Sequence, residues 1–230
     1  MTIKTIHAGH GGIDPGAVGN GYKEADIARQ ITDKMIAKTG AFNATDNSAI
    51  SVNDNLAKIV GNVERVSRSS NDWNISNHLN SASPQATGVE VFYFSTDSEA
   101  KQKAEQVSAV IATALGLPNR GAKHGNDLYV IRNTTGKMLL IEWGFISNAS
   151  DIKTLLANMD GAINEVIKLF GYQVSGTEKP SGNGSDSMSN SKPSGVRANT
   201  IGTVKLREDA VLKKTPDGYG ELTGQTVKMN

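Results

Sequence analysis

Apolar residues alternate between two spacings over residues 2–171, and this alternation restricts the fold more than any other feature. Short runs rich in β-branched and aromatic residues have the composition of β-strands. They are TIKTIH (2–7), WNISNHLN (73–80, ending near His78), GVEVFYF (88–94), LYVI (128–131) and KMLLIE (137–142). The last run is nearly all apolar, which predicts a central strand.

Helical spacing occupies the intervals between these strands. Ile27, Ile31 and Met35 recur every four residues before Gly40, so we expect a helix from Glu24 to that glycine. Further helical patterns lie at 56–63, with Ser51 and Asn53 as candidate caps, and at 97–116, 149–159 and 161–171. Strands that alternate with helices predict an α/β fold, with a mostly parallel sheet between two helical layers.

Composition divides the 230 residues into three parts. Residues 1–172 carry the periodic pattern and are long enough for one hydrophobic core. Residues 173–195 are almost wholly Ser, Gly, Asn, Pro and charged residues, which predicts a flexible linker. Residues 196–230 return to short alternating runs broken by PDGYG, which predicts hairpins in a β-rich C-terminal segment.

Charge and composition exclude several classes of function. Lys and Arg number 24 against 23 Asp and Glu, and this balance argues against nucleic acid as a partner. The absence of cysteine removes disulfides, thiolate metal sites and a cysteine nucleophile. No run approaches the ~20 apolar residues of a membrane span, and the N-terminus lacks a secretory signal pattern. We therefore expect cytoplasmic synthesis without membrane insertion, and export by another route.

The densest group of reactive residues is HAGHGGID, which begins at His7 where the first strand ends. Open α/β sheets bind their ligands at this end of their strands. The glycines allow the backbone to fold closely around whatever His10 holds. A structural turn is the simpler alternative, and a phosphate-binding loop is another, although no helix follows the glycines directly as that motif requires.

His10 and His78 both fall at strand ends of the same predicted sheet, so they can converge. Neutral imidazoles suit zinc, and two histidines with one glutamate are a recurring catalytic set that leaves a position for water. Glu24, in the first turn of the first helix, can supply the carboxylate. Taken singly, His78 also fits a structural role, and Glu24 also fits a carboxylate that stabilises a helix N-terminus.

Glu142 ends the apolar strand KMLLIE and precedes WGF. A carboxylate that emerges from such a hydrophobic wall should have a raised pKa, in the range useful for proton transfer. An ion pair or a helix cap is the alternative role. With the two histidines present, Glu142 is the candidate acid and base.

Five segments, in order, resemble the zinc-dependent N-acetylmuramoyl-L-alanine amidases (type 3) shared by bacterial cell-separation enzymes and phage endolysins. They are HAGHGGIDPGA, the following Glu24, SNHLNS, TGVEVFYF and LLIEWGFISNASD, and the match runs from about residue 3 to 170. The resemblance implies a sheet of about six strands flanked by helices. It also implies hydrolysis of the amide that joins N-acetylmuramic acid to L-alanine in bacterial peptidoglycan.

The resemblance implies zinc ligation by His10, Glu24 and His78 and a catalytic role for Glu142. Asn80 is a candidate substrate contact, although it fits a turn equally well. Two residues depart from the family pattern: His7 stands where an acidic residue is usual, which makes it a competing ligand, and Asn77 stands where a small apolar or β-branched residue is usual. His124 occupies no ligand position in the family, which leaves it as a surface or groove residue.

The C-terminal segment 196–230 resembles the opening strands of an SH3-like module that binds cell walls. A catalytic domain, a linker and a wall-binding segment are the layout of a phage endolysin, which acts at the wall after release; a prophage or host autolysin is the runner-up. A non-catalytic wall-binding protein, and a zinc peptidase or deacetylase that cuts another wall bond, remain as alternatives from other classes.

Overall fold

The computed structural model of the protein describes residues 2–174, 212–214 and 220–222. The chain divides into two compact units, residues 1–178 and 179–230. In the described part of the first unit, six strands form one sheet in the order β4-β1-β5-β8-β6-β7. These strands are β1 (Ile3–Ala8), β4 (Phe42–Asn43), β5 (Trp73–Asn80), β6 (Val89–Tyr93), β7 (Asn119–His124) and β8 (Lys137–Phe145).

The sheet is mostly parallel, as predicted. Only the pairing of β6 with β8 is antiparallel, and β7 then runs parallel to β6. The strand β8 lies in the interior of the sheet between β5 and β6, which confirms the central position expected from its apolar sequence. Because β6 and β7 are reversed, they begin at the edge of the sheet where β1, β5 and β8 end.

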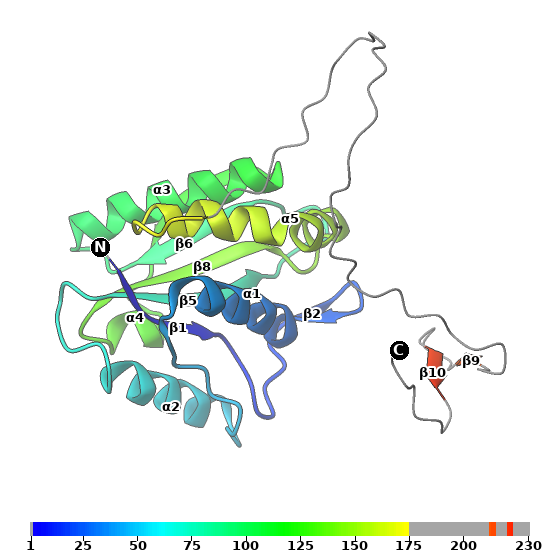
Figure 1. Ribbon diagram of the computed structural model, residues 1–230, viewed down its shortest axis with the longest axis horizontal. Helices are drawn as coiled ribbons and strands as arrows, with labels where there is room; N and C mark the ends of the chain where they lie inside the picture. Colours follow the sequence, from blue (N-terminus) through cyan, green and yellow to red (C-terminus); the bar gives the residue numbers. More distant parts are fainter. Residues whose placement is uncertain (1, 175–211, 215–219, 223–230) are drawn as a thin grey trace, which may run out of the picture. The chain divides into compact units, whose positions relative to one another are not determined.

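Helices cover both faces, which confirms the three-layer α/β architecture (Figure 1). The helices α1 (Glu24–Thr39), α3 (Ser98–Leu115) and α5 (Ala149–Lys168) contribute to the larger hydrophobic core on one face. The helices α2 (Val52–Glu64) and α4 (Tyr129–Arg132) contribute to a smaller core on the other face. We call these the apolar face and the polar face, because many sheet residues under α2 and α4 are polar.

Helix ends follow the residues that the sequence singled out. The Ser51 hydroxyl accepts a hydrogen bond from the Asp54 amide at 3.1 Å and caps α2. Gly40 ends α1 in the left-handed conformation with φ 69°, where a glycine avoids the steric cost of a side chain. Both ends match the predicted signals.

Two local predictions were wrong. Residues 128–131, expected as a strand, form α4, in which the Arg132 amide bonds to the Leu128 carbonyl at 3.0 Å. Val130 and Ile131 are buried in this helix. A short apolar run is compatible with a buried strand and with a buried helix, so the sequence pattern could not distinguish them. The edge strand β7 was missed because most of its residues are polar and exposed.

Residues 149–171, which showed two helical patterns, contain one continuous helix, α5. Gly161 lies inside it without ending it, and a side chain there would meet nothing within 4 Å. The glycine therefore weakens the helix slightly but does not break it.

In the second unit, the described strands β9 (Leu212–Lys214) and β10 (Gly220–Leu222) pair antiparallel. Residues 175–195 of the predicted linker and most of the predicted SH3-like segment lie outside the described residues, so these two assignments stay predictions. Among the described helices, none has the length and apolar character needed to cross a membrane.

Candidate metal centre

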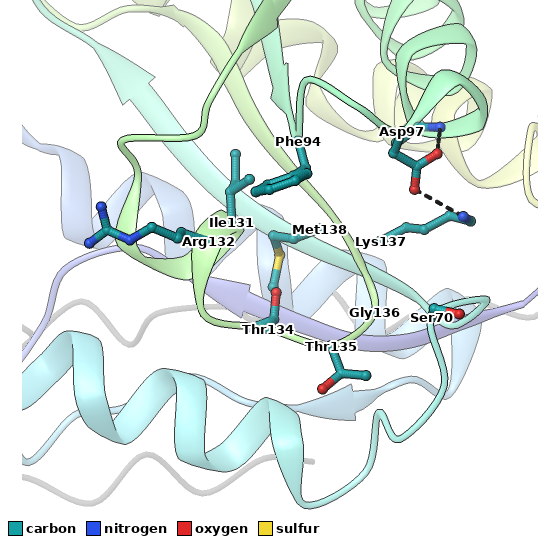
Figure 2. Close-up of a pocket in the computed structure, with 11 residues that line it drawn as sticks. Ser70, Phe94, Asp97, Ile131, Arg132, Thr134, Thr135, Gly136, Lys137 and Met138 are labelled. Atoms are coloured by element: carbon teal, nitrogen blue, oxygen red, sulfur yellow. Dashed lines mark hydrogen bonds and ion pairs between the residues drawn. The ribbon is translucent and has the colours of Figure 1, made fainter.

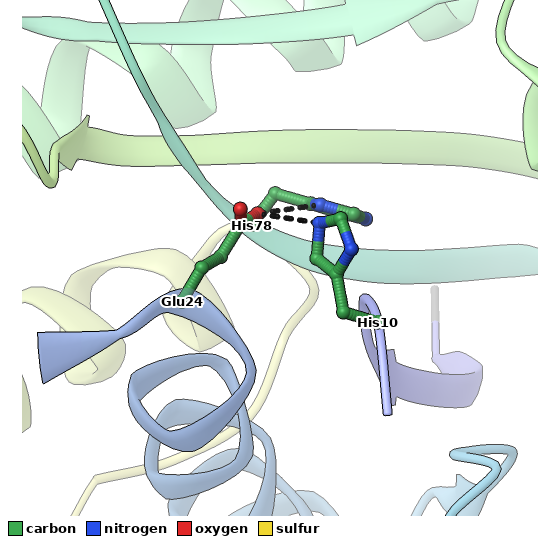
Figure 3. Close-up of side chains that lie close together, drawn as sticks. All are labelled: His10, Glu24 and His78. Carbon is green, nitrogen blue, oxygen red and sulfur yellow. Dashed lines mark hydrogen bonds and ion pairs between the residues drawn. The ribbon is translucent and has the colours of Figure 1, made fainter. Parts of the chain in front are cut away.

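His10, Glu24 and His78 meet at the edge of the sheet where β1 and β5 end (Figure 3). His10 follows β1, Glu24 begins α1, and His78 lies near the end of β5. Glu24 Oε1 lies 3.0 Å from His10 Nε2 and 2.9 Å from His78 Nδ1. One ligand atom from each residue falls within 4.8 Å of the other two. The three side chains therefore converge as the sequence predicted.

Neighbouring groups hold these side chains in place. Asp14 Oδ2 lies 2.8 Å from His10 Nδ1, so the second ring nitrogen of His10 is engaged by a carboxylate. The Leu79 amide donates to Glu24 Oε1 at 3.1 Å, and the Ala17 amide donates to Glu24 Oε2 at 3.0 Å. A carboxylate behind a ligating histidine is the usual support in metal sites, where it fixes the ring and increases its basicity.

The charges of the group also fit a divalent cation. Burial lowers the pKa of His10, but the hydrogen bonds and charges of Glu24 and Asp14 outweigh it and raise this pKa to about 9. Burial raises the pKa of Glu24, but its hydrogen bonds to the two histidines hold that pKa well below its ordinary value. Without a metal ion, Glu24 and Asp14 therefore favour a proton on His10, and a cation bound by these side chains would have to replace that proton.

Glu142 lies on β8, directly beside His78 in the register of the parallel pair β5 and β8. Its Oε2 atom is buried without a hydrogen-bond partner among the described residues. Burial raises the pKa of Glu142 to about 8, and the charges of Glu24 and Glu90 act in the same direction. The direction predicted from its hydrophobic wall is confirmed, and this carboxylate can hold or release a proton near neutral pH.

The family description N-acetylmuramoyl-L-alanine amidase matches residues 5–167, which include all four of these residues. The chain belongs to this amidase family. The amidase is 35% identical to the N-acetylmuramoyl-L-alanine amidase LytC of Bacillus subtilis over 159 residues, 65% of this chain and 30% of LytC. It therefore spans less than a third of that relative.

For two other relatives, the alignment covers a larger share of the relative's own length. The endolysin of Bacillus phage SPP1 is 27% identical over 224 residues, 93% of this amidase and 77% of the endolysin. The catalytic domain of CwlV, an N-acetylmuramoyl-L-alanine amidase from Bacillus (Paenibacillus) polymyxa var. colistinus, aligns with a TM-score of 0.62 at 27% identity. That alignment covers 74% of this chain and 98% of the CwlV domain, so the fold and the family agree.

Close backbone approach explains the glycine beside His10 in the amidase. A Cβ atom at Gly9 would overlap the imidazole of His78, so the bare backbone of Gly9 lies against this ring. The next residue, His10, has φ 60°, a left-handed conformation that is uncommon outside glycine. The loop thus requires both a missing side chain and a strained backbone to present His10.

Arg29, on α1, holds the His10 loop through hydrogen bonds of its guanidinium group. Sequence analysis did not single out this residue. Its guanidinium donates to the carbonyl of His10 at 3.0 Å and to that of Asp46 at 3.1 Å. Further bonds run to the Ala25 carbonyl at 2.8 Å and to Asn47 Oδ1 at 2.8 Å. One side chain therefore joins the His10 loop, the start of α1 and the 46–47 loop.

Residues 9–23 are mainly loop, but they contain a small hairpin of β2 (Val18–Gly19) and β3 (Tyr22–Lys23). Asn20 and Gly21 turn the chain with φ 53° and 83°. Asn-Gly is a strong short-range hairpin signal, and the sequence contained it. The hairpin leads directly into Glu24 and so positions this candidate ligand.

The Asn80 side chain bonds to Glu90 on β6. Its side-chain amide donates to Glu90 Oε1 at 2.7 Å, and Glu90 Oε2 pairs with Arg120 Nε at 2.7 Å. Glu90 lies beside Glu142 in the β6 and β8 register. Glu90 lies in TGVEVFYF, one of the segments that resemble the family, but neither Glu90 nor Arg120 was singled out as a site residue from the sequence.

Three other polar residues of the strands, His7, Asn77 and His124, lie outside the His10, Glu24 and His78 group. His7 is fully buried, both its ring nitrogens lack partners among the described residues, and burial lowers its pKa to about 3. It is not part of the His10, Glu24 and His78 group. Asn77 faces the opposite layer, where it bonds to Trp143 Nε1 and Thr32 Oγ1, both at 2.9 Å. His124 pairs with Tyr93, at the far end of the strands from Glu142.

Two pockets lie at opposite ends of the sheet. A pocket of about 490 Å³ adjoins the metal centre and is lined by residues of the His10 loop, by Lys23 and Arg29, and by Asn47. A pocket of about 250 Å³ surrounds the start of β8, where Lys137 binds Asp97 at 2.9 Å (Figure 2). Lys137 pairs with Trp73 at the start of β5, so this second pocket is remote from Glu142.

Proposed function

We propose that this amidase cleaves the amide between the lactyl group of N-acetylmuramic acid and L-alanine in peptidoglycan, with zinc held by His10, Glu24 and His78. The observation that carries the proposal is the convergence of these three ligand atoms beside Glu142. Two histidines and one glutamate leave a coordination position for water. A zinc ion bound there would lower the pKa of its water and polarise the amide carbonyl.

Glu142 performs the proton transfers in this proposal. Its buried Oε2 atom has no hydrogen-bond partner among the described residues, so this oxygen is not committed to an ion pair or a helix cap. A carboxylate with a pKa near the working pH accepts the proton of the water and then donates it to the departing alanine nitrogen. Asp14 keeps His10 oriented throughout, because it engages the ring nitrogen that faces away from Glu24.

We further propose that the chain is a phage endolysin that acts on bacterial peptidoglycan during host lysis. Its similarity to the SPP1 endolysin over 93% of the chain, which extends beyond the catalytic unit, supports this. In this proposal residues 196–230 form a partial SH3-like segment that binds the wall. A host autolysin is the second candidate, favoured by the similarity to the amidase LytC of Bacillus subtilis.

The chemistry is tested by measuring new N-terminal alanine released from purified peptidoglycan, together with the zinc content of each protein. Glu142→Gln should lower the release rate by roughly 10²- to 10⁴-fold with zinc retained. Glu165→Gln, which alters an exposed glutamate paired with Lys168 on α5, should leave the rate unchanged. Chelation should abolish release, and added zinc should restore it.

Three results would contradict parts of the proposal. A Glu142→Gln variant as active as the parent chain would remove Glu142 from its role. Full activity after complete removal of metal would exclude the zinc mechanism. Solubilised wall fragments without new N-terminal alanine would indicate that a different bond is cut.

A further inference from the structure

A row of paired positions crosses the sheet from His78, beside the candidate metal centre, to the edge strand β7. His78 on β5 pairs with Glu142 on β8, Glu142 pairs with Glu90 on β6, and Glu90 pairs with Gly121 on β7. Neighbouring strands lie about 4.8 Å apart, so the row spans about 14 Å. The metal centre and Glu142 account for the first half of the row, but the chemistry proposed above uses neither Glu90 nor Arg120.

Arg120 reaches this row through an irregularity in β7. Val89 pairs with Asn119, whereas the next residue, Glu90, pairs with Gly121, so Arg120 is an extra residue in the edge strand. Such a bulge redirects a side chain and is common next to active sites. Gly121, with φ 77°, accommodates the turn of the backbone that follows.

The guanidinium of Arg120 is fixed on two sides. Its Nε donates to Glu90 Oε2 at 2.7 Å, and its carbon lies 5.0 Å from the centre of the Phe145 ring. Nη1 makes only a long contact, 3.5 Å, with the Thr87 carbonyl. Among the described residues Nη2 has no partner, and 41% of the Arg120 side chain is exposed. The pair and the ring therefore orient a cation whose outer edge remains open.

An oriented guanidinium with free N–H groups matches a carboxylate, which it binds with two parallel hydrogen bonds. In the substrate proposed above, the lactyl carboxyl is already part of the scissile amide. Free carboxylates therefore belong to the peptide and not to the glycan. This assigns the Arg120 side of the sheet to the peptide.

The distance fits a residue close to the scissile bond. The guanidinium lies over β6 and β8, which is one to two strand spacings, or roughly 5–10 Å, from the His78 strand. An extended peptide spans about 3.3–3.6 Å per residue, so this corresponds to two or three residues. We propose that Arg120 binds a carboxylate of the peptide stem, two or three residues beyond the scissile amide. This inference rests on the proposed function.

Glu90 and Asn80 then act as positioning residues for Arg120. Glu90 Oε1 accepts from Asn80 and Oε2 from Arg120, so both carboxylate oxygens are engaged on the protein side. An alternative is that Arg120 only neutralises the buried Glu90. The two roles differ in one respect: neutralisation is indifferent to the charge of the substrate.

The test uses soluble muramoyl peptides in matched pairs. One pair carries the second residue of the stem with its carboxylate free or converted to a carboxamide, and another pair carries the C-terminal carboxylate of a three-residue stem in the same two forms. Zinc-loaded parent chain, Arg120→Gln, Arg120→Lys and Arg132→Gln are compared for KM and kcat. Arg132 is exposed on α4, and it lines the pocket remote from Glu142.

In at least one pair, Arg120→Gln should raise KM for the acid form roughly 10- to 100-fold, because hydrogen bonds to charged groups are the strong ones. Values of kcat, and KM for the amide form, should change less than about threefold. The KM of Arg120→Lys for the acid form should lie between those of the parent chain and Arg120→Gln. The KM of Arg132→Gln should equal that of the parent chain. Equal losses on acid and amide forms would overturn the inference and leave neutralisation of Glu90 as the role.

Binding separates this inference from the proposed function. Uncleaved acid and amide peptides are titrated into the Glu142→Gln chain with and without Arg120→Gln, and Kd is measured by calorimetry. A preference for the acid form that disappears with Arg120 supports the inference even if no cleavage is ever seen. Cleavage without any acid preference in binding or KM retains the proposed function and rejects the role of Arg120.

Discussion

The two faces of the sheet differ in what they cover. On the apolar face Ile75, Leu139 and Ile141 are fully buried in a core shared with three long helices. On the polar face the same strands present Ser76 and Glu142 beside a smaller core under α2 and α4. Of the five buried side-chain atoms without a partner among the described residues, four belong to His7, Ser76 and Glu142 on the polar face. The larger apolar core and most of these unpaired buried polar atoms thus lie on opposite faces of one sheet, and Glu24 reaches the candidate site from the end of α1.

The largest effect should appear in the pH dependence of the metal-free protein. The pKa of Glu142 rises from 4.5 to about 8 on folding, so the folded state holds this proton more tightly. Glu142 therefore contributes a loss of stability as pH rises from about 4.5 to about 8, by at most about 5 kcal/mol. Glu142→Gln should remove this loss, which is measured by denaturant unfolding in chelator from pH 5 to 8.5. If the free energy of unfolding depends on pH in the same way in the parent chain and in Glu142→Gln, the pKa of Glu142 is not raised by burial.

The next effect compares adjacent leucines of β8 that face opposite layers. Leu139→Ala should lower the free energy of unfolding by about 2–5 kcal/mol, because it leaves a cavity in the larger core. Leu140→Ala, in the smaller core, should cost less. Chemical denaturation of both variants measures the difference. A greater loss at Leu140 would show that the polar face also carries the main stability.

A smaller effect concerns the close approach at the metal centre. Gly9→Ala should displace the imidazole of His78 and weaken zinc affinity roughly 10- to 100-fold, as other disturbances of ligand orientation do. Competition with a chromogenic chelator measures this affinity. Gly61→Ala is the control, since a side chain at that position of α2 meets nothing within 4 Å and should add about 0.5–1 kcal/mol of stability. Unchanged zinc affinity in Gly9→Ala would mean that His78 binds from another position.

The smallest effect should come from a pair of buried serines. The Ser76 hydroxyl has no hydrogen-bond partner among the described residues, so Ser76→Ala should stabilise the chain by about 1 kcal/mol. Ser108, on α3, donates to the Val89 carbonyl at 3.1 Å, and Ser108→Ala should destabilise by a similar amount. Thermal unfolding should show that Ser76→Ala raises the stability and Ser108→Ala lowers it. If both variants change the stability in the same direction, Ser76 is not an uncompensated polar group of the polar face.

The sequence predicted most of what depends on periodicity and local signals. Helix α1 with its glycine end, the Ser51 cap and the central strand β8 follow from spacing and residue type alone. The convergence of His10, Glu24 and His78 followed because the ends of parallel strands meet at one edge. The raised pKa of Glu142 followed from its hydrophobic neighbours.

The rest depends on tertiary contacts that no local pattern encodes. Arg120 reaches Glu90 through a bulge in a polar edge strand, and Arg29 joins loops that are distant in the sequence. Residues 128–131 are apolar in a way that suits a strand, yet the packing under the sheet selects a helix. These misses share a cause: each residue's role is set by a neighbour outside its own segment.

The reversal of β6 and β7 has a consequence for how the molecule can be altered. Because both strands begin at the edge that holds the metal centre, the segments that lead into them, residues 81–88 and 116–118, arrive at the same edge. Neither segment contributes a candidate metal ligand. Loop exchange at these two connections would therefore remodel the wall beside Arg120 and leave the supports of the candidate metal ligands in place. These connections are thus suitable grafting points for altering which peptidoglycan the proposed activity cuts.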